Sequence, residues 1–264
     1  MRSVRRLLAA SAVLALAAGL TACTSSGGGS ASVNPAPARP EVKGTVTVFA
    51  AASLKESFTE LGKRFEAAYP GTTVTFNFGG SSALAQSIVS GAPADVFAAA
   101  SPATMKTVTD AKLAGGDPTV FVRNTLEIAV AKGNPKHIGG LKDLTGVKTA
   151  LCAKEVPCGA AAVTALKAAG VELTPVTYEQ DVKGALTKVE LGEVDASLVY
   201  QTDVKADSGK IEGVNFPEAA QAVNDYQVVS LGKASNANGA AAFLGYLGSA
   251  DARRVFTDAG FQAP

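Results

Sequence analysis

The sequence contains no tryptophan, one histidine and three cysteines in 264 residues. The single histidine, His137, stands in the stretch GNPKHIGG and is expected to be a solvated loop residue. One histidine excludes most Ser-His-Asp and Cys-His catalytic schemes, and no cysteine–histidine cluster could form a zinc site. The Walker A and GxGxxG spacings of nucleotide-binding loops are also lacking. The sequence therefore argues against an enzyme, and a secreted hydrolase is kept only as a minor alternative.

Neither sign of charge is in excess. The chain has 24 Lys and Arg against 23 Asp and Glu, and three of the arginines lie within its first six residues. Without those three the balance is 21 to 23, close to −2. No basic block occurs, so nucleic acid is not an expected partner. No stretch after Leu20 is apolar enough to span a bilayer.

The N-terminal region predicts export. Its arginines precede an apolar stretch from Leu7 to Leu20, which is typical of a signal peptide over residues 1–22. The following LTAC, ending at Cys23, resembles the lipobox of bacterial lipoproteins, and the resemblance implies that Cys23 becomes the diacylated first residue. An ordinary signal peptide with an incidental cysteine is the alternative. Residues 23–43, rich in Gly, Ser, Pro and Ala, predict a flexible tether, so we expect a domain anchored by lipid to the outer face of the cell membrane.

The two remaining cysteines, Cys152 and Cys158, are six residues apart. Because the chain is expected to enter an oxidising compartment, we predict a disulfide between them. The alternative is a pair of small buried apolar side chains.

Short apolar strands alternate with helical patterns along the mature chain. A strand at Val46–Ala51 is followed by a helix predicted from Ser53 to about Tyr69, and similar units recur to the end of the chain. This alternation predicts an α/β fold with mostly parallel sheets flanked by helices. The strand-like stretches 118–133 and 226–232 could each cross between lobes. We therefore expect lobe 1 at 44–125 plus 228–264 and lobe 2 at 126–227.

Ligands of such sheets bind beyond the carboxyl ends of the strands, where helices begin. Four of these junctions place Ser53, Ser81, Cys158 or Val182 in a first helical turn, and none carries Arg or Lys. The alternative for the serines is simple helix capping: Ser53 and Glu56 have capping-box spacing, and Asp181 has the position of an N-cap.

The junctions together could hold a small dianion without a basic side chain. Each helix N-terminus contributes about half a positive charge and free N–H groups. Three or four converging termini thus offer roughly +1.5 to +2. A site made only of donors selects a fully deprotonated ligand, such as sulfate or molybdate, over hydrogen phosphate.

Several motifs resemble those of the molybdate-binding proteins of bacterial ABC transporters. The motifs are VTVFAAASL, FGGSSALAQSIVSGAPADVF, DVKGAL, VYQTD and FPEAA, in that order. The resemblance implies a two-lobed, type II periplasmic-binding-protein fold with the ligand in the cleft between the lobes. It also implies no cofactor, a monomer that delivers molybdate or tungstate to a membrane permease, and these anion-binding residues: Ser53, Ser81, Cys158, Val182 and Tyr200.

Some assignments stay open. Tyr200, on pattern alone, is a core residue whose hydroxyl reaches the rim of its strand. Cys158 stands where relatives commonly have alanine, and Asp203 is a further candidate for ligand contact. The same fold could carry sulfate, phosphate or ferric iron instead of molybdate, or could serve a surface adhesin or sensor.

Overall fold

The computed structural model describes residues 41–264. The expected signal peptide, Cys23 and nearly all of the tether lie outside the described residues. Within the part that is described, no helix is long and apolar enough to cross a membrane.

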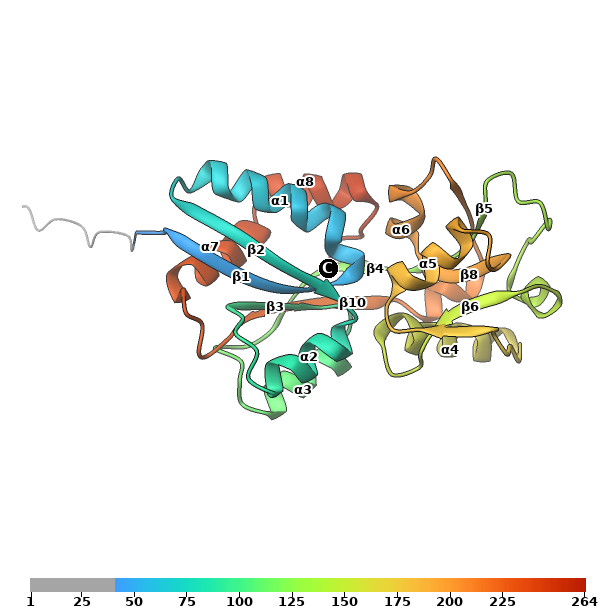
Figure 1. Cartoon of the computed structure of the whole chain (residues 1–264), viewed down its shortest axis with the longest axis horizontal. Helices are drawn as coiled ribbons and strands as arrows, with labels where there is room; N and C mark the ends of the chain where they lie inside the picture. The colour runs from blue at the N-terminus through green and yellow to red at the C-terminus, as the bar shows by residue number, and fades with distance from the viewer. Residues whose placement is uncertain (1–40) are drawn as a thin grey trace, which may run out of the picture. The chain divides into compact units, whose positions relative to one another are not determined.

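Two five-stranded sheets organise the domain, and each carries helices on both faces (Figure 1). The first sheet has the strand order β2-β1-β3-β10-β4 and the second has β7-β6-β8-β5-β9. The strands of the first sheet are β1 (Gly44–Ala51), β2 (Thr72–Gly79), β3 (Val96–Ala99), β4 (Thr119–Asn124) and β10 (Asn224–Ser230). Those of the second are β5 (Leu126–Ala131), β6 (Thr149–Cys152), β7 (Thr177–Glu179), β8 (Ala196–Tyr200) and β9 (Ile211–Val214).

The two sheets share one pattern of strand directions. In the first, β1 pairs in parallel with β2 and β3, whereas β10 is antiparallel to both β3 and β4. In the second, β6 pairs in parallel with β7 and β8, whereas β5 is antiparallel to both β8 and β9. Each sheet thus has one reversed strand in its fourth position, and the predicted two-lobed α/β architecture is confirmed.

Side-chain alternation explains why both faces of the first sheet are covered. Along β1, Val48 and Ala50 point into one apolar cluster, whereas Phe49 between them points into another. The first cluster packs under α1 (Lys55–Ala68), α7 (Ala237–Leu247) and α8 (Ala250–Ala259), and the second under α2 (Ser81–Val89) and α3 (Pro102–Asp110). In the second lobe α4 (Pro157–Ala169) lies on one face of the sheet, and α5 (Val182–Glu190) and α6 (Gln201–Ala206) lie on the other (Figure 1).

The chain passes between the sheets twice, at neighbouring positions. Thr125 alone separates β4 of the first sheet from β5 of the second. On the return, β10 belongs to the first sheet from Asn224, somewhat before the expected boundary at residue 228. Asn124 and Asn224 are register partners in the β4–β10 pair, so the two crossings lie side by side.

The structure departs from the local sequence patterns at several points. Ser53 does not cap a helix: it lies within a 3-10 turn, η1 (Ala52–Leu54), and α1 begins at Lys55 without a side-chain cap. The short strand β7 covers only Thr177–Glu179, because Pro175 just before it cannot donate to a ladder. The sequence patterns missed four short elements. These are β9, α6 and two further 3-10 turns, η2 (Leu141–Gly146) and η3 (Pro217–Gln221).

Candidate functional site

A small cavity lies between the two lobes at the carboxyl ends of their strands. Its volume, counted as the space open to the centre of a water-sized sphere, is about 20 Å³. The lining residues are Ala51, Ala52, Ser53, Gly79, Gly80, Ser81, Ala100, Val156, Pro157, Cys158, Asp181, Val182 and Tyr200. None of them is Arg or Lys.

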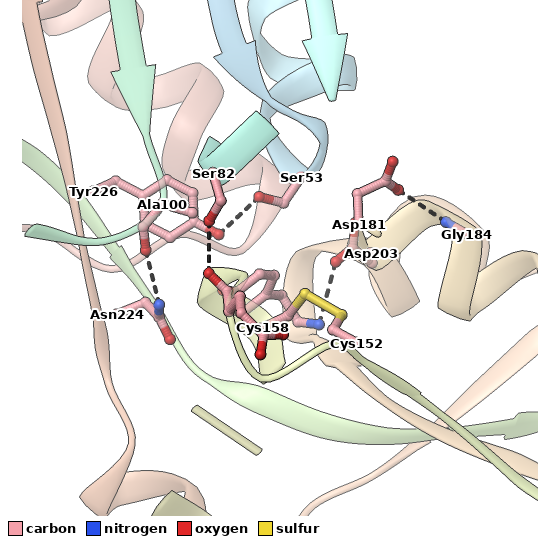
Figure 2. Close-up of a disulfide and its surroundings, with 12 residues drawn as sticks. Ser53, Ser82, Ala100, Cys152, Cys158, Asp181, Gly184, Asp203, Asn224 and Tyr226 are labelled. Atoms are coloured by element: carbon pink, nitrogen blue, oxygen red, sulfur yellow. Dashed lines mark hydrogen bonds between the residues drawn. A yellow bond between two sulfur atoms is a disulfide. The ribbon is translucent and has the colours of Figure 1, made fainter. Parts of the chain in front are cut away.

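The first lobe contributes two buried serines. The Ser53 hydroxyl lies 2.8 Å from the Tyr226 hydroxyl of β10, and the contact is buried (Figure 2). Ser81, the first residue of α2, accepts a hydrogen bond from the Ala100 N–H through its Oγ at 3.1 Å. Both hydroxyl oxygens thus have a partner within their own lobe, which fixes their positions at the cavity wall.

The second lobe contributes two helix N-termini. Cys158 is the second residue of α4, and Val182 is the first residue of α5. The first N–H groups of an α-helix have no partner inside the helix, so they are free to meet a guest. The expected N-cap is present at α5, where Asp181 Oδ1 accepts from the Gly184 N–H at 2.9 Å (Figure 2).

Tyr200 supplies the most unusual group in the cavity. Tyr200 is 1% exposed, and its hydroxyl, which lies beside Tyr226, makes no well-formed hydrogen bond within residues 41–264. Burial, followed by the neighbouring Tyr226 and Asp203, raises the pKa of Tyr200 well above its ordinary value, so the hydroxyl stays protonated and can donate. A buried hydroxyl without a partner costs about 1–3 kcal/mol. The Tyr200 hydroxyl is therefore a donor available at the cavity wall.

Behind Tyr200 lies a cluster of charged side chains. Asp203 is fully buried, and its Oδ2 accepts from the Tyr200 N–H at 3.2 Å. Its Oδ1 lies 3.1 Å from Lys183 Nζ, which is also 3.1 Å from Glu56 Oε2. Burial raises the pKa of Asp203 to about 6 against the opposing effect of Lys183. Burial lowers the pKa of Lys183, but the carboxylates of Asp203 and Glu56 outweigh it and leave that pKa raised.

The geometry suits a small anion held by uncharged donors. Hydroxyl groups and helix N-termini face one another across a cavity too small for a nucleotide or a peptide. Among residues 41–264, no group of three or more His, Cys, Asp or Glu side chains is arranged to hold a metal ion.

The five residues carried over by resemblance all line this one cavity: Ser53, Ser81, Cys158, Val182 and Tyr200. Asp203 does not line it and lies behind Tyr200 instead. His137 is exposed, as expected. The partner of Ser53, Tyr226, was missed because it comes from a strand more than 170 residues away, and no local pattern connects the two.

Cys152 and Cys158 are joined by a disulfide in the structure, with Cα atoms 5.8 Å apart (Figure 2). Cys152 ends β6, and Cys158 lies in the first turn of α4. The bond therefore closes the loop that carries the Cys158 N–H to the cavity.

Comparisons with known proteins agree with this geometry. A family model for bacterial extracellular solute-binding proteins matches residues 46–262. The molybdate-binding protein ModA of Mycobacterium tuberculosis is 42% identical over 252 residues, covering 94% of this chain and 95% of that protein.

Two further similarities are to Bacillus subtilis and Clostridium difficile proteins. The ABC transporter substrate-binding lipoprotein YvgL of B. subtilis is 34% identical, covering 84% of this chain and 88% of that protein. The solved substrate-binding domain of a C. difficile molybdenum ABC transporter is 28% identical with a TM-score of 0.64, covering 84% of this chain and all of that one.

Proposed function

The chain belongs to the bacterial extracellular solute-binding proteins, and from this premise we propose that it captures molybdate and delivers it to the permease of an ABC transporter. The M. tuberculosis relative, which aligns over nearly the full length of both chains, supports molybdate as the cargo. The family acts by binding, so the chain is a solute carrier and not an enzyme.

The Tyr200 hydroxyl carries the proposal. It is buried at the cavity, has no well-formed hydrogen bond within residues 41–264 and stays protonated, so it can donate to an acceptor in the guest. We infer that the anion accepts hydrogen bonds from five residues: Ser53, Ser81, Cys158, Val182 and Tyr200. Cys158 and Val182 would donate through their backbone N–H groups, which explains why neither position needs a polar side chain.

The same donors fit tungstate, because it has the same charge and nearly the same size as molybdate. Sulfate has the same charge and shape but shorter bonds, so we expect its oxygens to meet the same donors less well and to bind more weakly. The protein requires no cofactor beyond this ligand, and we expect it to act as a monomer with the cleft complete in one chain.

We also propose attachment to the outer face of the cell membrane through acyl chains, palmitate among them, on Cys23. The lipobox-like LTAC sequence supports this, as does the similarity to a B. subtilis substrate-binding lipoprotein. Residues 23–43 would then act as the spacer between membrane and domain.

Calorimetric titration tests the cargo. We expect molybdate and tungstate to bind with one site per chain and to raise the Tm, by an amount equivalent to about 2.7 kcal/mol at a hundredfold excess over Kd. Sulfate at the same concentration should change the Tm little. An equal response to sulfate would refute the selectivity, and no response to any of the three would refute the function.

A further inference from the structure

The charged side chains of Glu56, Lys183 and Asp203 form a cluster at the cleft, and none of them is a proposed anion donor. Lys183 of α5, in the second lobe, lies between two carboxylates. One belongs to Asp203 of its own lobe, and the other belongs to Glu56 of α1 in the first lobe. The Lys183–Glu56 contact therefore joins the two lobes across the cleft.

Each member of the cluster is close in sequence to a proposed anion donor. Glu56 follows Ser53 by three residues, Lys183 is next to Val182, and Asp203 accepts from the Tyr200 N–H. The cluster thus connects three of the five donor-bearing segments. A separation of the lobes that parts Glu56 from Lys183 would also move Ser53 away from Val182.

The exposure of the three side chains increases from Asp203 through Lys183 to Glu56. The Asp203 side chain is 0% exposed, Lys183 is 21% exposed and Glu56 is 47% exposed. The Lys183–Asp203 contact therefore belongs to the folded second lobe, where Lys183 neutralises a carboxylate directly behind Tyr200. The Glu56 contact lies near the rim, where lobe separation would break it first.

From these contacts we propose that the Glu56–Lys183–Asp203 cluster is a positioning latch that forms when the lobes close. It holds the donor-bearing segments of both lobes at anion-binding distance. This inference rests on the proposed function. Lys183 acts through the donors, and the cation itself does not line the cavity.

Glu56→Gln tests the latch, because it removes the charge at the cleft rim and leaves the Lys183–Asp203 contact in place. We expect the Kd for molybdate to rise about two- to fivefold at low ionic strength, as for a partly exposed ion pair. The difference should shrink in 0.5 M salt, since exposed charges are screened there. The Tm of the ligand-free protein should not change, and Glu56→Asp should restore part of the affinity.

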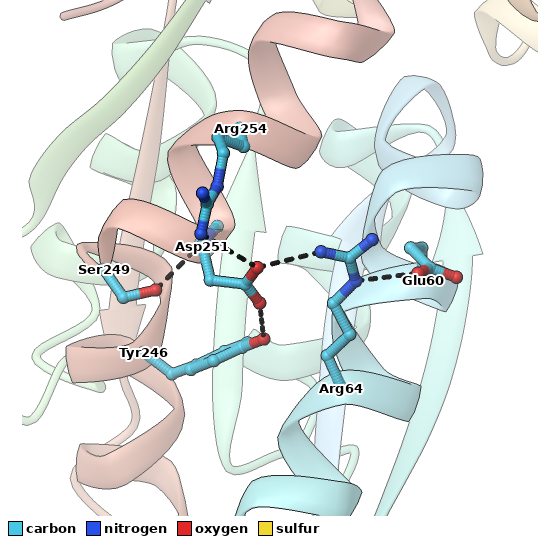
Figure 3. Close-up of polar contacts among 7 residues, drawn as sticks. Glu60, Arg64, Tyr246, Ser249, Asp251 and Arg254 are labelled. Carbon is cyan, nitrogen blue, oxygen red and sulfur yellow. Dashed lines mark hydrogen bonds and ion pairs between the residues drawn. The ribbon is translucent and has the colours of Figure 1, made fainter.

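Glu60→Gln is the matched control. Glu60 lies one turn further along α1 and pairs with Arg64 Nε at 2.7 Å, and Arg64 also reaches Asp251 of α8 within the same lobe (Figure 3). This variant removes the same charge from the same helix without touching the cleft. We expect it to bind molybdate like the wild type.

Lys183→Gln completes a double-mutant cycle. In this background Glu56→Gln should cause no further loss of affinity, because the partner is already gone. The latch is refuted if Glu56→Gln binds like Glu60→Gln, or if it weakens binding equally with and without Lys183. A wild type that does not bind molybdate would refute the proposed function instead. The latch would then be tested by the same double-mutant cycle with sulfate or phosphate as the titrated anion, and an absence of coupling between Glu56 and Lys183 in binding would refute it.

Discussion

The hydroxyl groups of Ser53 and Tyr226 lie 2.8 Å apart and join the first strand–helix junction to the returning strand β10. The Ser53 hydroxyl has one proton, and it can give that proton to an anion only while it accepts from Tyr226. Tyr226 is fully buried, and burial raises its pKa far above its ordinary value, so it remains a donor. The orientation of Ser53 therefore depends on a residue from a distant strand.

Tyr226→Phe should weaken molybdate binding by about 1 kcal/mol, or roughly fivefold in Kd, because Ser53 loses its orienting partner. Tyr246→Phe is the control, since Tyr246 also makes a hydrogen bond, to Asp251 at 2.7 Å, but on α7 outside the cavity (Figure 3). Titration calorimetry on both variants makes the comparison. Equal affinities would contradict an orienting role for Tyr226.

Tyr200→Phe should separate binding from stability. The variant loses a donor to the anion, and we expect its Kd to rise by the equivalent of about 1–3 kcal/mol. The ligand-free variant should unfold at a Tm no lower than that of the wild type, because the lost hydroxyl makes no well-formed hydrogen bond in the part of the chain that the structure describes. A fall in the ligand-free Tm, measured by calorimetry, would show that the hydroxyl has a partner within the fold.

Gly80→Ala should prevent the lobes from closing. A Cβ at Gly80 would overlap the carbonyl oxygen of Gln180 in the opposite lobe, whereas its φ of −59° suits alanine within its own lobe. We therefore expect a folded protein whose Kd for molybdate rises more than tenfold. Small-angle scattering should show no compaction when ligand is added. Gly116→Ala, where a Cβ meets nothing within 4 Å, should behave like the wild type.

Asp203 should make the stability depend on pH with a sign unusual for a carboxylate. Its pKa is about 6 in the folded protein and about 3.9 in an unfolded chain. Between these values the folded state holds a proton that the unfolded state has lost. The contribution of Asp203 to the free energy of unfolding therefore falls as pH rises from about 4 to about 6, and it is constant outside that window.

Urea unfolding of the wild type and Asp203→Asn at pH 4.5 to 7 measures this contribution. The groups that face Asp203 are Lys183 and Glu56, together with the Tyr200 N–H and the buried Tyr226. We expect the free energy of unfolding of the wild type minus that of the variant to decrease by at most about 1.4 kcal/mol per pH unit. An increase with pH would mean that Lys183 lowers the carboxyl pKa more than burial raises it.

The disulfide should stabilise both the fold and the site. For a loop of this length, chain entropy predicts that removing the bond costs about 2 kcal/mol. Cys152→Ala with Cys158→Ala should lower the free energy of unfolding by that amount, and reductant should destabilise the wild type but not the double variant. Alkylation of the untreated protein should leave both cysteines unmodified. Two reactive thiols would contradict the bond.

Local patterns predicted most of the fold, because the spacing of apolar side chains in neighbouring residues distinguishes a strand from a helix. The strand at Val46–Ala51 and the Asp181 cap are examples. The prediction that Ser53 caps a helix was wrong, because Ser53 lies in a 3-10 turn and its hydroxyl contacts that of Tyr226. Contacts between distant segments, such as that of Lys183 with Glu56, depend on how the two lobes pack together. The spacing of residues within one segment does not predict that packing.

The register pairing of Asn124 with Asn224 has a mechanical consequence. Both connections between the sheets pass through one short length of paired strand, so neither lobe can slide past the other without breaking that ladder. Rotation about this line is the motion that leaves both sheets intact. Exchange of the anion then requires the side of the cleft away from the paired strands to swing outward, and the bound guest is released through a single opening.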